Sequence, residues 1–301
     1  LTENSTWSKD FLKLNLTSLY DNEFDLKLTG FSDDELSKLL PDFNIDEGLT
    51  DEDDVPTPPE EPVTKLGDIW LCGEHRVMCG DSTSVDNLDK LMTGERPDML
   101  FTDPPYNIDY QGVSDKRDKI KNDKMNENDF KDFLMESLYS CEIMYVCCSW
   151  QYSHIFKQVM IEIGRKPKAM IVWNKVNPAQ HLDKYFKQHE LMYYYGDFGG
   201  HKTLRGDIWT LKRQKNTYHP TTKPVELIDI AIQDQNNISL ILDVFLGSGS
   251  TLISAQKNKK KCYGLELDPK YCDVIVKRWQ NYTGEEATLE SDGAKFNDML
   301  K

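Results

Sequence analysis

Short apolar runs alternate with amphipathic stretches from residue 66 onward, and this alternation constrains the fold more than any other feature of the chain. Apolar runs of strand length predict strands at 76–81, 98–102, 143–149, 169–174, 191–195, 238–244 and 262–267. Helical spacing between these runs predicts helices at 84–93, 128–140, 152–164, 223–234, 250–258 and 269–281. Strands that alternate with helices in this way indicate an α/β fold, with a doubly wound, mostly parallel sheet that helices cover on both faces.

The chain, at 301 residues, is long enough for one large α/β domain and an appendage. Residues 1–42 suggest a small helical appendage, and residues 43–65 are acidic and carry prolines. Such a composition predicts a solvated linker, with a nucleic-acid mimic as the weaker alternative. The main domain then spans 66–282, with irregular insertions at about 175–222, and the polar tail 283–301 should be loosely held.

Acidic residues are concentrated at the start of the chain. Residues 1–62 hold 17 of the 51 Asp and Glu residues and 4 of the 36 Lys and Arg residues, which leaves 34 acids and 32 bases in the rest. A nearly neutral body can still carry the basic face that contact with nucleic-acid phosphates requires. The 7 cysteines show no framework spacing, as in reduced cytoplasmic proteins. No apolar run approaches the roughly 18 residues of a membrane span, so we expect a cytoplasmic protein and no membrane partner.

The tetrapeptide Asp103-Pro104-Pro105-Tyr106 directly follows the strand predicted at 98–102. Open α/β sheets bind ligands at the carboxyl ends of their strands. The exocyclic amine of a nucleobase is a poor nucleophile, because its lone pair is delocalised into the ring. The Asp103 carboxylate and the Pro104 carbonyl could accept its hydrogens, and Tyr106 could stack on the base. We therefore predict that these four residues are catalytic; an ordinary Asx-Pro turn is the alternative.

A glycine turn with Gly247 and Gly249 follows a later predicted strand and leads into a helix that begins at Ser250 and Thr251. Strand, glycine turn and helix start are typical of a site for a nucleoside-bearing cofactor. The third glycine of a dinucleotide site and the lysine of a P-loop are absent, so nothing here suits a pyrophosphate. Glu266 ends the next strand 19 residues after Gly247, a spacing that suits an acid bound to ribose hydroxyls.

Further positions fit a site at the same sheet edge. Asp81 and Ser82 end a predicted strand and could bind an adenine edge or the cofactor backbone, although an N-cap for the helix 84–93 fits nearly as well. Lys223 stands at a helix start and could pair with a carboxylate, with an exposed lysine as the alternative. No second ligand pair completes a zinc-like spacing of Cys and His, so we predict no metal site.

These motifs together resemble the S-adenosylmethionine-dependent amino-methyltransferases of DNA, of the beta class, whose catalytic motif precedes the cofactor motif. The resemblance covers about residues 66–282. It rests on Gly80-Asp81-Ser82, Asp103-Pro-Pro-Tyr106, His219-Pro-Thr-Thr-Lys223-Pro224-Val-Glu226, Asp243-Val-Phe245-Leu-Gly247-Ser-Gly249-Ser-Thr251 and Glu266-Leu-Asp268. Val244 and Leu246 stand where the family more often has proline and glycine. Residues 1–42 resemble the helical tail of a ParB-like module.

The resemblance implies a Rossmann-like class I methyltransferase fold, S-adenosylmethionine as the cofactor, and site-specific N6 methylation of a flipped adenine in double-stranded DNA. An aspartate at position 103 resembles the adenine-N6 members, since the cytosine-N4 members more often carry serine there. The implied cofactor-binding residues are Asp81, Ser82, Lys223, Asp243, Phe245, Gly247, Gly249, Ser250, Thr251, Glu266 and Asp268. Among these, Lys223 is implied to lie near the cofactor carboxylate, and a homodimer and a cognate restriction enzyme are candidate partners.

Basic residues in two predicted loops are candidates for contact with DNA. They are Lys116, Arg117, Lys119 and Lys121 in the loop 111–127, and Lys202, Arg205, Lys212 and Arg213 in the irregular segment 196–222. A solvated loop is the alternative for the first group. Other functions remain open on the same scaffold: cytosine-N4 methylation, methylation of RNA or of a protein amide, and a DNA-binding adaptor with a vestigial site.

Overall fold

The computed structural model describes residues 48–108, 124–179, 187–196, 205–212 and 222–300, with residues 12, 16, 29 and 185 as isolated positions. The chain separates into two compact units, Leu1–Glu47 and Gly48–Lys301. In the first unit, Leu12 and Leu16 are helical, and Leu16 is buried. Apart from Thr29, the rest of the predicted appendage 1–42 lies outside the described residues, as does most of the loop 111–127.

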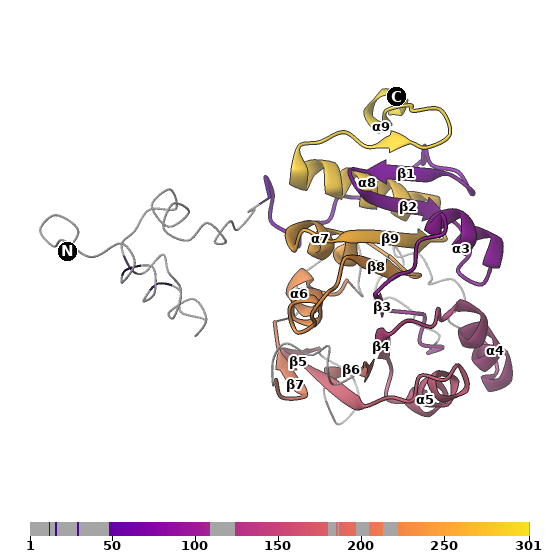
Figure 1. Ribbon diagram of the computed structural model, residues 1–301, viewed down its shortest axis with the longest axis vertical. Helices are drawn as coiled ribbons and strands as arrows, with labels where there is room; N and C mark the ends of the chain where they lie inside the picture. The colour runs from indigo at the N-terminus through magenta and orange to yellow at the C-terminus, as the bar shows by residue number, and fades with distance from the viewer. Residues whose placement is uncertain are drawn as a thin grey trace, which may run out of the picture. The chain divides into compact units, whose positions relative to one another are not determined.

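Among the described residues, ten strands form one sheet in the order β10-β1-β2-β9-β8-β3-β4-β6-β5-β7 (Figure 1). The strands are β1 Ile69–Cys72, β2 His75–Cys79, β3 Met99–Thr102, β4 Ile143–Cys148, β5 Ala169–Ala179, β6 Lys187–Tyr195, β7 Ile208–Thr210, β8 Leu240–Asp243, β9 Lys261–Glu266 and β10 Thr288–Leu289. The central strands β2, β9, β8, β3 and β4 are parallel to one another. The strand β6 runs antiparallel to both β4 and β5, and β1 runs antiparallel to β2 and β10. The mostly parallel sheet predicted from the sequence is confirmed.

Helices cover both faces of this sheet, as predicted (Figure 1). They are α3 Val85–Met92, α4 Glu127–Ser137, α5 Ser153–Glu162, α6 Val225–Gln233, α7 Ser250–Lys257, α8 Pro269–Thr283 and α9 Phe296–Met299. Successive strand residues enter opposite cores. Phe101 and Cys147 pack with α6, α7 and α8, whereas Leu100 and Cys148 pack with α3, α4 and α5. Among the described residues, no helix is long and apolar enough to span a membrane.

The predicted loosely held tail is wrong for the described residues up to 300. Phe296 is 1% exposed and packs edge-on against Trp70, with ring centroids 5.1 Å apart. Leu289 of β10 pairs with Trp70 of β1 and extends the sheet. A two-residue strand and a four-residue helix are too short to produce a periodic apolar pattern, so neither could be predicted from the residues.

The predicted solvated linker is also wrong from residue 48 onward. The Leu49 N–H donates to the Tyr282 carbonyl at 2.8 Å, and the Val63 N–H donates to the Asp273 carboxylate at 2.8 Å. Val55 lies buried between these two points. The many acids of this segment suggested solvation, but several of them face basic partners in the domain, so charge alone was misleading.

Two strands extend beyond their predicted ends into polar residues. β5 continues to Ala179 rather than 174, and β6 begins at Lys187 rather than 191. Because β6 is antiparallel to β4, its first residues lie at the carboxyl end of β4. The extensions therefore bring Lys175 and Glu190 to the edge of the sheet where β3 ends.

Candidate active site

The turn after β3 holds Asp103 at the carboxyl edge of the sheet, where β3 lies between β4 and β8. Pro104 is buried, and Asn107 adopts a positive φ of 60°. The Asn107 side chain accepts from the Met125 N–H at 2.5 Å and donates to the Met125 carbonyl at 2.9 Å. The turn is thus held by Asn107, and the Asp103 side chain is 23% exposed.

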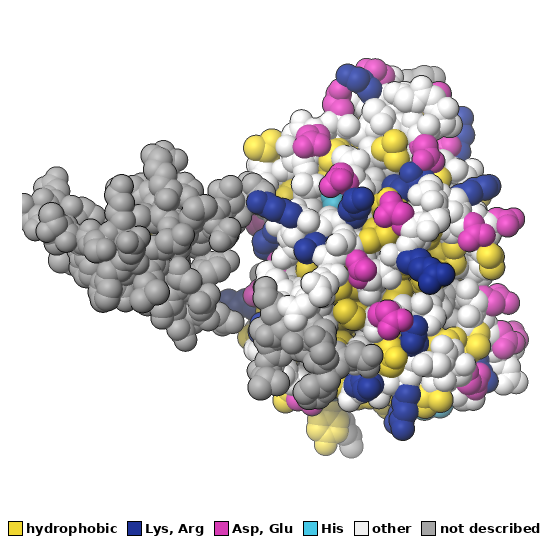
Figure 2. All heavy atoms as spheres, viewed as in Figure 1, with side chains coloured by type: hydrophobic (Ala, Val, Ile, Leu, Met, Phe, Trp, Pro, Cys, Tyr) yellow, Lys and Arg dark blue, Asp and Glu magenta, His cyan; other side chains and the backbone are white. Residues whose placement is uncertain are grey.

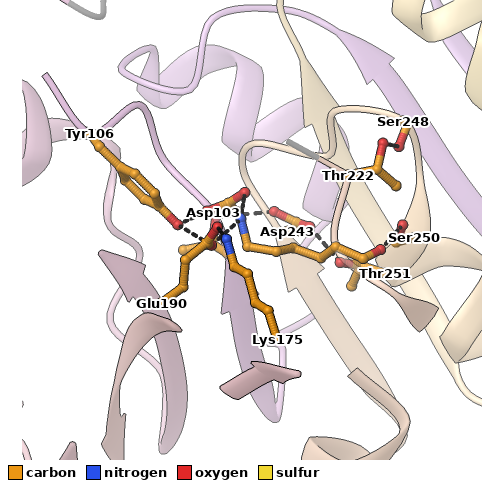
Figure 3. A network of polar contacts seen from close by, with 11 residues as sticks. Asp103, Tyr106, Lys175, Glu190, Thr222, Asp243, Ser248, Ser250 and Thr251 are labelled. Atoms are coloured by element: carbon orange, nitrogen blue, oxygen red, sulfur yellow. Dashed lines mark hydrogen bonds and ion pairs between the residues drawn. The ribbon is translucent and has the colours of Figure 1, made fainter. Parts of the chain in front are cut away.

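The Asp103 carboxylate belongs to a network of alternating charges (Figure 3). Lys223 donates to Asp103 Oδ2, and its Nζ lies 3.1 Å from Glu190 Oε2. Lys175 donates to Glu190 Oε1. The Tyr106 hydroxyl donates to Asp103 Oδ1 at 2.5 Å and lies 3.4 Å from Glu190 Oε2. Figure 3 shows Asp103, Tyr106 and Glu190 pointing toward one another, so residues from four segments converge on one point.

The network shifts the pKa values of its two carboxyl groups in opposite directions. Burial raises the pKa of Asp103, and the nearby charge of Glu190 adds to this effect, while Lys223 offsets part of it. Burial also opposes ionisation of Glu190, but the charges and hydrogen bonds of Lys223 and Lys175 outweigh it and lower the pKa of Glu190 to about 2. Burial alone would lower the pKa of Lys223, yet Asp103 and Glu190 hold it above its ordinary value. Lys223 therefore stays protonated, and of the two carboxyl groups in the network Asp103 is the more readily protonated.

The ring of Tyr106 packs against both cores beside this network. It contacts Phe156 edge-on, with ring centroids 6.5 Å apart, and the Lys223 ammonium lies 5.5 Å from its centroid. A positive charge near an aromatic ring is attracted to its electron-rich face. The ring is half-buried, which leaves part of it accessible to a ligand.

A second, buried carboxylate fixes the end of β8. Asp243 is 3% exposed, and its Oδ1 accepts from the Thr102 hydroxyl and the Phe245 N–H, both at 3.0 Å. Its Oδ2 accepts from the Thr251 hydroxyl at 2.6 Å. Burial raises the pKa of Asp243 to about 6 despite these bonds. Asp243 therefore joins β3, β8 and the first turn of α7, and it acts on the site through the backbone it holds.

The glycine turn has the conformation that its sequence requires. Gly247 and Gly249 have φ values of 56° and 87°, in the left-handed region that glycine tolerates best. A Cβ added to Gly249 would lie 3.1 Å from Ile275 Cγ2. The Gly247 N–H donates to Glu266 Oε2 at 2.9 Å, and the Asp268 N–H donates to Glu266 Oε1 at 2.8 Å. Burial raises the pKa of Glu266 to about 7, and the two backbone donors only partly oppose it.

Lys223 links the glycine turn to the Asp103 network. Its ammonium reaches Asp103, while its carbonyl accepts from the Ser250 hydroxyl at 2.7 Å. The neighbouring Thr222 hydroxyl lies 3.4 Å from that of Ser248 (Figure 3). The lysine is 6% exposed, so the exposed alternative is wrong, and its predicted pairing with a carboxylate is seen with Asp103 and Glu190. The implied position of Lys223 near a cofactor carboxylate stays a prediction.

Asp81 and Ser82 lie beside the end of β9. The Gly80 N–H donates to the Glu266 carbonyl at 2.9 Å, which places the end of β2 next to the acid of β9. The Asp81 carboxylate accepts from the N–H and the hydroxyl of Thr83, both at 2.9 Å. Ser84, rather than Asp81 or Ser82, caps α3. The helix-cap alternative is therefore wrong for these two residues.

The predicted DNA contacts are mostly outside the described residues: Lys116, Arg117, Lys119, Lys121, Lys202 and Arg213. Of the other two, Lys212 is exposed, whereas the Arg205 guanidinium lies 3.2 Å from Asp234, at the end of α6. On the face shown in Figure 2, basic and acidic side chains of the described residues are interspersed.

His75 has structural partners, and the cysteines are buried. The His75 ring accepts from the Cys262 N–H at 3.0 Å, and its other nitrogen lies 2.8 Å from Gln256 Oε1. Within the part of the chain that the structure describes, no cluster of His, Cys, Asp and Glu is arranged to hold a metal ion. The seven cysteines are buried free thiols.

Sequence reasoning missed Thr102, Lys175 and Glu190, together with Asn107 and Arg278. The signal for two of them was weak but present, because Lys175 and Glu190 are charged residues that directly adjoin apolar strand residues. A charge at the end of a buried strand is expensive unless it is paired or functional. Thr102 and Asn107 flank the tetrapeptide but carry no pattern of their own. Arg278 lies in a helix of mixed character, where nothing in the sequence marks it as buried.

Two family models match the chain. Residues 97–277 match the DNA methylase family of N6 and N4 methyltransferases, and residues 10–66 match the ParB-methyltransferase HTH domain. The second match confirms the predicted resemblance of the N-terminus to a ParB-like module. The matched range runs to residue 66, so it includes residues 48–65, which the structure places in the second unit.

Proteins similar in sequence to this chain include type II methyltransferases. The type II methyltransferase M2.MboI of Moraxella bovis is 26% identical over 223 residues, which cover 62% of this chain and 81% of that protein. M2.DpnII of Streptococcus pneumoniae is 25% identical over 224 residues, which cover 62% and 84% of the two chains. The crystal structure of the M1.HpyAVI–SAM complex superimposes with a TM-score of 0.51 at 20% identity, covers 67% of this chain and 98% of that one, and shows the shared fold. The chain, with its carboxylate and glycine turn at one sheet edge, therefore belongs to the DNA methylase family and is a methyltransferase that acts on DNA.

Proposed function

We propose that this enzyme transfers a methyl group from S-adenosylmethionine to the N6 amine of an adenine flipped out of double-stranded DNA. The observation that carries the proposal is the position of Asp103: a partly exposed carboxylate at the end of β3, joined through Lys223 to the glycine turn. The base-binding and cofactor-binding elements are then neighbours, as a direct transfer between two bound molecules requires.

The residues at the glycine turn fit such a cofactor. The left-handed Gly247 and Gly249 leave the backbone open to close approach by a ligand. Glu266 is half-buried beside the turn, and a carboxylate there suits the two hydroxyls of a ribose. When bound, S-adenosylmethionine supplies a methyl carbon that is electrophilic because it is attached to a positively charged sulfur.

The chain's own residues would activate the amine. Asp103 Oδ1 and Oδ2 each have a further lone pair beyond the bonds from Tyr106 and Lys223, so the carboxylate can still accept from an amine N–H. The carbonyl of Pro104 can accept the second hydrogen. Two accepted hydrogen bonds shift electron density toward the amine nitrogen and stabilise the positive charge that develops on it during transfer. The ring of Tyr106 would hold the base in place by stacking, which is worth about 1–3 kcal/mol per base.

Cytosine-N4 methylation is the alternative, because the matched family includes both N6 and N4 enzymes. The aspartate at position 103 favours adenine. The substrate base is identified by incubating the purified protein with DNA and isotopically labelled S-adenosylmethionine, followed by mass analysis of the nucleosides. Labelled N6-methyladenine supports the proposal, and labelled N4-methylcytosine would replace it with the alternative.

Two variants test the role of Asp103. Asp103→Ala should abolish methyl transfer while S-adenosylmethionine binding, measured by calorimetry, survives. Asp132→Asn, which changes an exposed acid on α4, is the matched control and should keep full activity. Activity retained in Asp103→Ala would remove this carboxylate from the mechanism.

We also propose self-association and a cognate restriction enzyme as partners, by analogy with the type II methyltransferases that the chain resembles. Sedimentation analysis of the purified protein tests the first of these. A strictly monomeric species that is fully active would exclude the dimer from the mechanism.

A further inference from the structure

Arg278 of α8 is buried at the back of the glycine turn. Arg278 is only 2% exposed. Its Nη1 donates to the Ser248 carbonyl at 2.9 Å and lies 3.3 Å from the Ser250 hydroxyl. Ser248 stands between the two left-handed glycines, so this guanidinium holds the middle of the turn. Its Nη2 donates to the Glu52 carbonyl at 2.7 Å. The same side chain therefore contacts the turn on one side and the segment 48–65 on the other.

A buried guanidinium needs compensating charge, and the acidic strap, Asp51 to Asp54, supplies it. Burial lowers the pKa of Arg278 to about 10, and the four acids of the strap oppose that effect. The Glu52 carboxylate is itself held by Lys257, which also pairs with Asp229 at 2.8 Å. The strap is thus fixed to α7 and α6 rather than free in solvent.

The strap also holds the segment that carries Lys223. Asp53 Oδ1 accepts from the N–H of Val225, the first residue of α6, at 2.9 Å. A carboxylate at this position satisfies a free N–H group and interacts favourably with the helix dipole. Lys223 lies two residues earlier and accepts the hydrogen bond from Ser250 through its carbonyl. Adjacent strap residues, Glu52 and Asp53, therefore support both sides of the glycine turn.

We propose that Arg278 is a positioning residue for the cofactor, and that the acidic strap keeps it in place, so that the catalytic unit begins at about residue 48 rather than 66. This inference rests on the proposed use of S-adenosylmethionine. Without the strap, Arg278 would lose its Nη2 partner and the surrounding negative charge. The guanidinium would then move toward water and release the Ser248 carbonyl, and the turn between Gly247 and Gly249 would lose its fixed conformation.

The test compares two pairs of acids in the full chain. Glu52→Gln/Asp53→Asn removes two charges from the strap but keeps the side-chain shapes, and an Asn at 53 can still accept from Val225. The matched control, Glu60→Gln/Glu61→Gln, removes two exposed charges from the same segment. Arg278→Met removes the guanidinium itself, and Arg278→Lys keeps its charge without the two-sided fork.

Hydrogen bonds to a charged group are typically strong enough that their loss weakens binding about 10- to 100-fold. We expect Arg278→Met to raise the Kd for S-adenosylmethionine, measured by calorimetry, and the KM for cofactor by about that factor. The strap variant, which removes charge around Arg278 but keeps the Glu52 carbonyl, should raise both in the same direction by a smaller factor. The KM for DNA should be unchanged. Arg278→Lys should recover part of the affinity, and the control should bind as the parent chain does.

Several outcomes would overturn the inference. Unchanged cofactor affinity in both the strap variant and Arg278→Met would refute it, as would an equal loss in the Glu60/Glu61 control. A parallel rise in the KM for DNA would indicate general loss of structure instead of positioning. If the parent chain bound no S-adenosylmethionine, the proposed function would fail first and this inference with it. A parent chain that binds while all variants bind equally would refute the inference alone.

Discussion

Opposite changes to the two charged partners of Asp103 should move the pH dependence of methyl transfer in opposite directions. Asp103 must be ionised to accept the amine hydrogens, so kcat/KM should fall as the pH drops through its pKa. Lys223→Met removes the ammonium that donates to Asp103, and the pKa of Asp103 should rise. The acid limb of the profile then moves to higher pH. Glu190→Gln removes a like charge, so the same limb should move to lower pH.

The size of the effect follows from the burial of the network. A hydrogen bond to a charged partner contributes about 1.5–3 kcal/mol. At pH values below the pKa of Asp103, kcat/KM of Lys223→Met should therefore be about 10- to 100-fold lower than that of the parent enzyme. Breaking a buried ion pair typically destabilises by about 3–5 kcal/mol. Because the side chains of Asp103 and Glu190 are 23% and 24% exposed, water can solvate the carboxylates when Lys223 is removed. We therefore expect a destabilisation at the lower end of that range. About 3 kcal/mol corresponds to a fall in Tm of roughly 6–12 °C.

The assay is the rate of methyl transfer to DNA between pH 5 and 9, at a temperature at which thermal melting shows each variant to be folded. Lys131→Met is the control, because it breaks a partly exposed pair with Glu162, between α4 and α5 and outside the Asp103 network; the N–O distance of this pair is 2.8 Å. The double variant Lys223→Met/Glu190→Gln removes one charge of each sign and should recover part of the lost stability. Shifts in the same direction, or no shift in either single variant, would refute the assigned charge network.

Three further predictions concern the cofactor turn and the limits of the domain. Because burial raises the pKa of Glu266 to about 7, the ionised carboxylate predominates only above that pH, so affinity for S-adenosylmethionine should rise as the pH increases through 7. Glu266→Gln should bind more weakly and without that pH dependence, as calorimetry at several pH values would show. Gly249→Ala should weaken cofactor binding, because the Cβ would meet Ile275 at 3.1 Å, whereas Gly94→Ala, at a similar φ of 84° in open space, should not. Phe296→Ala should lower the free energy of unfolding by about 3–5 kcal/mol in denaturant titrations, while Leu300→Ala, at 44% exposed, should change it little.

The sequence was most informative where local chemistry and strand position coincided. Asp103 and the glycine turn could be located because each directly follows a strand whose apolar run is unmistakable. Glycines at 247 and 249 are required by their φ values, so the sequence reported a backbone conformation that the structure contains. The parallel direction of the central strands was predicted from the alternation of strands and helices.

The sequence was least informative where a charge has a distant partner. Glu190 and Lys223 meet although 33 positions separate them in the chain, and Lys223 meets Asp103 across 120 positions. Nothing local distinguishes such a residue from a solvated one. The acidic strap shows the same difficulty, since its partner Arg278 lies 226 positions from Glu52. Composition therefore predicted solvation where the fold supplies a buried counter-charge.

The order of strands also has a consequence for synthesis of the protein. β2 and β3 are consecutive in the chain, yet β9 and β8 lie between them in the sheet. A nascent polypeptide that has emerged from the ribosome only as far as residue 239 holds strands from both flanks of a sheet whose middle strands, β9 and β8, are still missing. Met99 and Leu100 can pair with Ile241 and Leu242 only afterwards. Such late insertion closes long loops, so we expect slow folding, during which the open edges of β2 and β3 would need protection by chaperones.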